Sequence, residues 1–120
     1  MKILLSMIFL LTFFCKFAFS DEQQIIAKGD IEYGEYLGSE CAACHQQSGA
    51  SEGIPSNQGM DAEVFVALML AYRSKEMENP VMQMIAGRLN DEEIGSLALY
   101  FSGLESPEWS YFHLLKVKIW

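Results

Sequence analysis

The sequence predicts a small all-α domain. Two segments, residues 61–74 and 90–103, carry apolar side chains at helical spacing, and each begins with a residue that commonly caps helices. No segment shows the convincing alternation of apolar and polar residues that indicates a β-strand. With 120 residues, the chain is long enough for one small domain but not for two.

The first twenty residues have the three parts of a secretory signal peptide. Lys2 supplies the positive start, residues 3–14 form a short apolar run, and Ala18-Phe19-Ser20 ends the segment with a small-x-small pattern. The alternative is a transmembrane anchor, but the apolar run is short for a bilayer span and Lys16 interrupts it before the exit. We therefore expect export to the periplasm, cleavage near Ser20 and no membrane attachment afterwards.

The charge of the chain narrows the choice of partners. Loss of residues 1–20 removes Lys2 and Lys16, which leaves six basic residues against sixteen acidic ones and a net charge of −10. Nucleic acid and anionic lipid are poor partners for such a protein, whereas a basic protein surface is a better one. The same charge also serves simply to keep a small exported protein soluble.

The residues Cys41-Ala42-Ala43-Cys44-His45 form the C-x-x-C-H sequence that attaches a c-type haem. Two thiols three positions apart at a helix end can reach the two vinyl groups on one edge of a porphyrin. The histidine that follows then lies beneath the ring and offers its imidazole to the iron. The sequence therefore predicts one covalent haem c, attached through Cys41 and Cys44 and ligated by His45.

The cysteine pair could also serve in a structural disulfide or in thiol–disulfide exchange. A structural disulfide across two residues would close a very small loop and stabilise the fold little. A thiol–disulfide oxidoreductase also uses C-x-x-C, but such proteins set the motif between a strand and a helix. Here residues 31–40 favour a short helix, and nothing downstream alternates strand with helix. A zinc site would need further cysteines.

The remainder of the chain reads as helices separated by loops. Residues 46–59 are rich in glycine and serine and indicate a loop, and residues 61–74 indicate a helix that Asp61 caps. Residues 75–88 are expected to be irregular, because Asn79-Pro80 is typical of a helix stop. The last helix starts from Asn90, a cap residue.

The ends of that last helix carry the clearest signals in the chain. Glu93 lies three residues after Asn90, as in a capping box, and Gly103 stands where the helix is expected to end. A domain this small buries too little apolar surface to be more than marginally stable by itself. A haem would add the buried apolar surface that the chain lacks.

The second iron ligand must come from the second half of the chain. Met60, which precedes a cap, and Met69, on an apolar helix face, are expected to serve in packing. Met82 and Met84 lie just after Pro80, and spacing alone does not choose between them. His113 is a weaker alternative, because methionine–histidine ligation is usual in cytochromes c.

Several segments, in this order and at this spacing, resemble class I cytochromes c. They are Cys41 to His45, Gly53-Ile54-Pro55-Ser56, Val64-Phe65-Val66, Tyr72-Arg73-Ser74, and Asn79-Pro80-Val81-Met82 through to Ile94. Within that family, residues 60–66 and 72–76 look most like the cytochrome subunit of flavocytochrome c sulfide dehydrogenase. The resemblance implies a small helical domain wrapped around one covalent haem, with Met82 as the second iron ligand. It also implies that the Pro55 carbonyl accepts a hydrogen bond from the ring of His45.

Two departures from the family matter. Met84 is a possible substitute ligand, and residues 105–120 extend beyond a domain that looks complete at residue 104. This aromatic-rich tail is expected either to contact a partner or to pack on its own domain. The expected organisation is thus a signal peptide (1–20), a cytochrome c domain (21–104) and a C-terminal tail (105–120).

The function implied is single-electron transfer between redox proteins, without catalysis by the chain alone. One form is the cytochrome subunit of a sulfide-oxidising flavocytochrome, with a flavoprotein as partner. The alternative is a free soluble carrier that delivers electrons to a terminal oxidase or another reductase. A haem enzyme or sensor would need the Met82 position to be open, because two filled axial positions leave no site for substrate.

Overall fold

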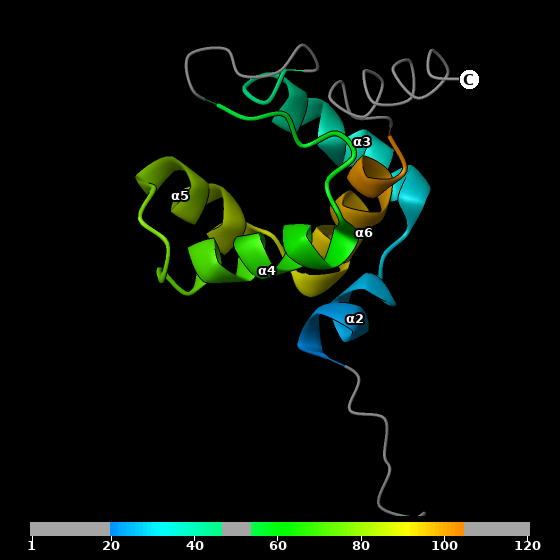
Figure 1. The fold of residues 1–120 in the computed structure, drawn as a ribbon, viewed down its shortest axis with the longest axis horizontal. Helices are drawn as coiled ribbons and strands as arrows, with labels where there is room; N and C mark the ends of the chain where they lie inside the picture. Colours follow the sequence, from blue (N-terminus) through cyan, green and yellow to red (C-terminus); the bar gives the residue numbers. More distant parts are fainter. Residues whose placement is uncertain (1–19, 47–53, 105–120) are drawn as a thin grey trace, which may run out of the picture.

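The computed structural model describes residues 20–46 and 54–104, and this part of the chain is helical, with no strand (Figure 1). The prediction of an all-α fold is confirmed. The helices are α2 (Asp21–Ile26), α3 (Ile31–Ala42), α4 (Ala62–Arg73), α5 (Pro80–Arg88) and α6 (Asp91–Ser102). None of them is both long and apolar enough to cross a membrane. The predicted signal peptide, except Ser20, and the tail from residue 105 lie outside the described residues, as does His113.

Side-chain caps explain where these helices begin. Asp61 Oδ1 accepts hydrogen bonds from the backbone N–H groups of Glu63 and Val64, at 3.0 and 3.1 Å. Asn90 and Glu93 form a complete capping box, in which each side chain accepts from the other residue's backbone N–H. Both caps are where the sequence predicts them, and each satisfies backbone donors that have no partner within the helix.

The prediction of irregular structure across residues 75–88 is wrong in its second half. Asn79 does not end a helix but begins α5, and its side chain accepts a hydrogen bond from the backbone N–H of Met82 at 3.1 Å. Pro80 occupies the first helical position, where a missing N–H costs nothing and the fixed φ angle favours the helix. The helix expected over residues 31–40 also continues through Cys41 to Ala42.

Helix α6 forms the centre of the fold and packs against α2, α3 and α4. It contributes Ile94, Leu97, Ala98 and Phe101 to a core that also contains Ile25, Phe65, Val66, Met69 and Ala86. The prediction that Met69 is a core residue is confirmed, since its side chain is 5% exposed. Helix α5 is different, because among the other four helices it packs against α4 alone and so projects from the bundle (Figure 1).

Close backbone contact joins α3 to α6. A Cβ atom built on Gly34 would lie 2.0 Å from the backbone oxygen of Ser96, which no real Cβ could tolerate. The Ser96 side chain is fully buried, and its hydroxyl accepts a hydrogen bond from the backbone N–H of Asp30 at 2.9 Å. Glycine on α3 therefore allows the two helices to approach to backbone contact.

A small ion-pair network ties three helices together at the start of α6. The Asp91 carboxylate lies 3.0 Å from Lys28 Nζ, just beyond α2, and 2.9 Å from the Arg73 guanidinium at the end of α4. Arg73 also donates to the backbone oxygen of Leu89. The hydrogen bonds from Lys28 and Arg73 hold the pKa of Asp91 below its ordinary value.

Replacing Asp91 with asparagine should destabilise the protein by about 1 kcal/mol at neutral pH, a modest value because these partly exposed pairs are screened by solvent. Since the folded-state pKa is depressed, the wild-type advantage should be full above about pH 5 and disappear as the pH falls through the folded pKa. Denaturant unfolding of both proteins across that range measures the difference. The control is Glu92→Gln, which removes a neighbouring charge from the same helix turn. If this variant lost as much stability as Asp91→Asn, with the same pH dependence, Asp91 would have no specific role.

Candidate cofactor site

A cavity of about 610 Å³ lies between α3 and α5. Both helices line it without contacting each other, while α4, α6 and the segment before α4 supply its remaining walls. Most of the lining side chains are apolar, among them Leu37, Ile54, Phe65, Leu68, Ile85, Leu89 and Leu97. The volume falls within the range of roughly 300–1,000 Å³ that is usual for sites that hold cofactors or small ligands.

Cys41, Cys44 and His45 all line this cavity. Cys41 belongs to the last turn of α3, and the chain then folds back so that the backbone N–H groups of Cys44 and His45 both donate to the Cys41 carbonyl, at 3.2 and 2.8 Å. Side chains three and four positions apart share one face of a helical turn. The turn therefore places both thiols and the imidazole at the same cavity.

The His45 ring is oriented by the segment that leads into α4. Its Nδ1 atom lies 2.6 Å from the backbone oxygen of Pro55, the contact that the family resemblance implies. A carbonyl only accepts, so this hydrogen bond places the ring proton on Nδ1 and leaves the lone pair on Nε2. When a histidine binds a metal through one ring nitrogen, a hydrogen-bond acceptor on the other nitrogen fixes the tautomer and raises the basicity of the ring.

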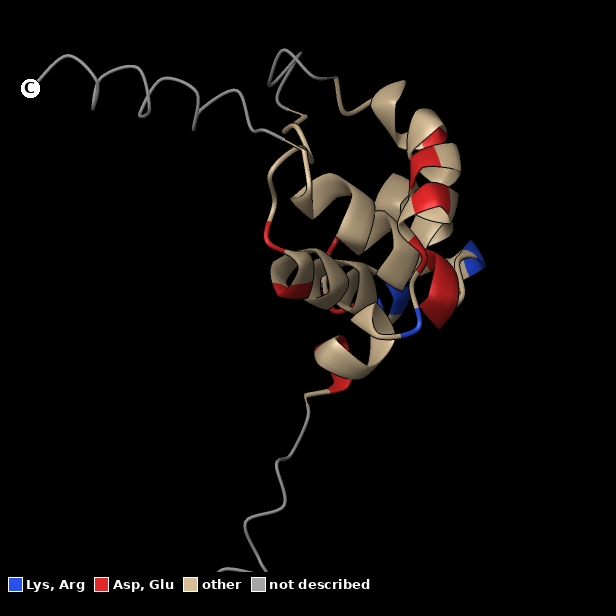
Figure 2. Ribbon diagram, turned by 90° about the vertical axis from the view of Figure 1, so that its right-hand side faces the viewer, with Lys and Arg blue, Asp and Glu red and all other residues tan. Residues whose placement is uncertain are grey.

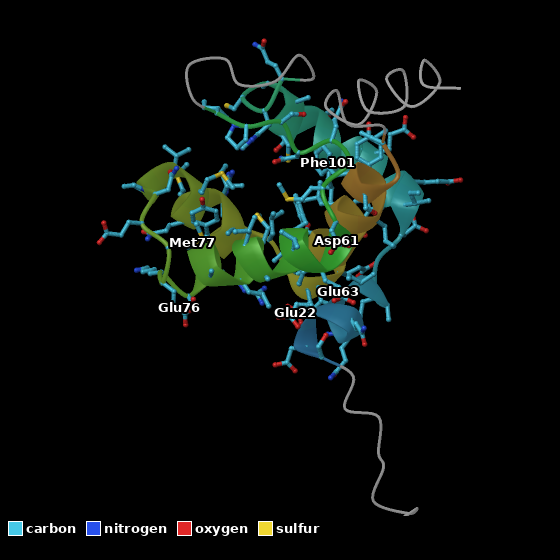
Figure 3. The ribbon with its side chains drawn as sticks, viewed as in Figure 1. Glu22, Asp61, Glu63, Glu76, Met77 and Phe101 are labelled. Carbon is cyan, nitrogen blue, oxygen red and sulfur yellow. The ribbon has the colours of Figure 1, made fainter. Side chains whose placement is uncertain are left out.

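The structure separates the two methionines that spacing left open. Met82 is half-buried and lines the cavity, whereas Met84 is 59% exposed and does not line it. Met82 lies in the first turn of α5, across the cavity from α3. Met77, in the connection between α4 and α5 (Figure 3), does not line the cavity.

Two further methionines that sequence reasoning assigned to packing also reach the cavity. Met69 lines it from the buried face of α4, and Met60 lines it from the segment before that helix. The only local signal at Met60 is the Asp61 cap that follows, which says nothing about a cavity. Asn57, Tyr72 and Arg88 also line the space and carry no recognisable motif.

The chain is similar in sequence to a curated protein. The protein named "Thiosulfate dehydrogenase electron acceptor" of Stutzerimonas stutzeri (strain A1501) is 33% identical over 94 residues, which represent 76% of this chain and 42% of the relative. The chain thus spans less than half the length of that relative. No protein-family model matches the chain.

The surroundings of Cys41 argue against a thiol–disulfide oxidoreductase. Burial raises the pKa of the Cys41 thiol, and the negative charge of the neighbouring Glu40 raises it further. Reactive thiols of that class have lowered pKa values and favour helix N-termini, whereas Cys41 lies at the C-terminal, negative end of α3.

A second hollow, shallower and of about 430 Å³, lies beside α4. Charged side chains of Glu22, Arg73 and Glu76 line it together with small and apolar residues of α4. It shares no residue with the cavity between α3 and α5 and contains none of the predicted site residues. The predicted site residues that the structure describes are therefore gathered in one place.

Proposed function

We propose that the chain is an electron-transfer protein that carries one haem c, attached through Cys41 and Cys44 and ligated by His45 and Met82. The observation that carries this proposal is the convergence of two thiols and an oriented imidazole on one apolar cavity, with a thioether across it. That donor set is the one that a covalent haem with histidine–methionine ligation requires.

The bound iron would supply a one-electron change of oxidation state. The protein's residues would hold the ligands and exclude water. The Pro55 carbonyl keeps Nε2 of His45 available, and the Met82 thioether favours the reduced state over what a second histidine would give. Apolar walls disfavour a net charge in the cavity, which also raises the reduction potential. With His45 and Met82 both holding the iron, no metal site would be left for a substrate, and the chain would transfer electrons only.

The electron donor that we propose is an enzyme that oxidises reduced sulfur compounds. The similar protein is named as an electron acceptor of thiosulfate dehydrogenase, and the family resemblance pointed to sulfide dehydrogenase. Both names describe oxidation of inorganic sulfur. The chain spans only part of that relative. The proposal therefore includes both forms of donor, a separate enzyme or a flavoprotein subunit in a stable complex with this chain. Export to the periplasm, with cleavage near Ser20, completes it.

Covalent haem attachment is the decisive test. Expression with a cytochrome c maturation system should give a coloured protein whose haem stain survives boiling in detergent, because thioether bonds are not broken by denaturation. The double variant Cys41→Ala with Cys44→Ala should lose the stain completely. The matched control Ala42→Ser with Ala43→Ser, which changes two residues of the same motif but neither thiol, should keep it. A colourless wild-type protein that is correctly exported would refute the proposal.

A further inference from the structure

The solvent face of α3 combines aromatic, apolar and acidic side chains. Ile31, Tyr33 and Tyr36 are 54%, 37% and 74% exposed, and Glu32 and Glu35 stand exposed among them. We call these five residues the α3 face. Large apolar side chains gathered on the surface of a small protein are uncommon unless they contact something, and aromatic residues are enriched at protein interfaces.

The two tyrosines of this face are already ordered. Their rings lie nearly parallel, with centroids 6.4 Å apart and an interplanar angle of 10°. The Tyr33 hydroxyl donates to Glu93 Oε1 at 3.3 Å, which ties the pair to the start of α6. Side chains that are held in place lose less conformational entropy when a partner binds. The Tyr36 ring is still 74% exposed, so most of its surface can contact a partner.

The charge of the α3 face has one sign. Helix α3 contains no lysine or arginine, and the nearest basic residue along the chain, Lys28, pairs with Asp91. Figure 2 shows red, acidic stretches on several helices and little blue, basic ribbon. A field of one sign attracts a partner of the opposite sign and speeds its association. A basic protein surface is therefore the complement of this face.

The α3 face also leads directly to the candidate site. Tyr36 and Cys41 are five residues apart on one helix, which is about 7.5 Å along its axis and about 140° around it. Glu40, the next exposed carboxylate after Glu35, lies at the wall of the cavity itself. A protein that docks here would stand close to the attachment end of the proposed haem.

We propose that the α3 face is the docking surface for a redox protein with a basic surface, an inference that rests on the proposed electron-transfer function. Glu32 and Glu35 steer the partner by their charge, and Tyr36 with Ile31 provides the apolar contact. The electron then crosses near Cys41 rather than at the far side of the cavity.

The test uses the haem-loaded protein with mitochondrial cytochrome c, a basic haem protein, as the probe. Carbodiimide cross-linking at low salt should join Glu32 and Glu35 to lysines of the probe. The variant Glu32→Gln with Glu35→Gln should slow electron exchange about fivefold at low salt, and the difference should vanish in strong salt, where screening removes steering. Tyr36→Ala should speed dissociation of the probe about threefold.

Matched controls separate location from total charge. Glu76→Gln with Glu78→Gln removes the same charge from exposed positions, and Figure 3 shows Glu76 on the side of the molecule away from α3. Val64→Ala trims an apolar side chain that is 50% exposed on α4. Both controls should leave the rates within about twofold of wild type. Equal slowing by both glutamate pairs would overturn the proposal.

The chain's own tail is the other possible occupant. Cross-links from Glu32 and Glu35 to Lys116 or Lys118 of the same molecule, in place of the probe, would show that the tail covers this face and would overturn the proposal. Failure of the proposed function looks different. A protein without haem lacks the absorption spectrum and exchanges no electrons in any variant, whereas a misplaced docking surface leaves the spectrum intact.

Discussion

Replacing Met82 with alanine should abolish the near-infrared absorption band that a methionine sulfur gives on haem iron. It should also lower the reduction potential by about 0.1–0.3 V, a part of the roughly 0.8 V range over which axial ligands set haem potentials. The thioether favours the reduced iron, and alanine would leave that position to water. Absorption spectroscopy of the oxidised protein and a redox titration measure the two effects.

The control for this experiment is Met84→Ala, two residues along the same helix. Met84 is 59% exposed and lies outside the cavity lining, so its loss should leave the band and the potential unchanged. If the band survives Met82→Ala and disappears in Met84→Ala, the ligand is Met84. If it disappears only in Met60→Ala, the ligand comes from the segment before α4, which also lines the cavity.

The second large effect is expected at the contact between α3 and α6. Gly34→Ala should lower the free energy of unfolding by about 3 kcal/mol, the upper end of the usual cost of overpacking. The new Cβ would meet the Ser96 backbone oxygen at 2.0 Å and its carbonyl carbon at 2.6 Å. Backbone atoms in the buried middle of α6 cannot move aside as the end of a flexible side chain can. The helices must therefore separate.

A glycine elsewhere provides the comparison. A Cβ atom on Gly87, in α5, would meet nothing within 4 Å, so Gly87→Ala should stabilise the protein by about 0.5–1 kcal/mol through helix propensity. Thermal unfolding followed by circular dichroism measures both variants, and 3 kcal/mol in a domain of this size corresponds to more than about 10 °C. Similar melting temperatures for Gly34→Ala and wild type would mean that the helices are not held this closely.

Local sequence signals predict the elements that depend on local interactions. The capping residues Asp61 and Asn90 act within one helical turn, and so α4 and α6 begin where the sequence indicates. Asn79-Pro80 is ambiguous by the same logic, because the pair is suited both to ending one helix and to beginning another. Only packing of the following residues on α4 decides the matter, and that contact is not visible in a short window of sequence.

Helix α2 was missed for a related reason. It has six residues, too few to show a period, and its Ser20 cap is the expected cleavage point of the signal peptide. Its buried residue is Ile25, beside Gly95 of α6, where an added Cβ would come within 2.2 Å of the Ile25 backbone oxygen. A contact between residues seventy positions apart is a tertiary property that local propensity does not encode.

The candidate site was predicted only in part. The attachment motif and its histidine are contiguous, so spacing alone brings them together. An irregular segment does not distinguish Met82 from Met84, since extended residues two apart point the same way. In a helix they point about 200° apart, and so the formation of α5 itself is what directs one to the cavity and the other to solvent.

The attachment of α5 to α4 alone has a consequence for how such a protein can diversify. Substitutions on α5 change the wall of the cavity and the outer surface, but only Ala86 of this helix belongs to the shared core. The changes in folding free energy caused by substitutions at distant sites add independently when the sites share no contacts. If the proposed haem is bound, selection can therefore adjust its electronic properties through α5 while the packing of α3 on α6 continues to set whether the chain folds.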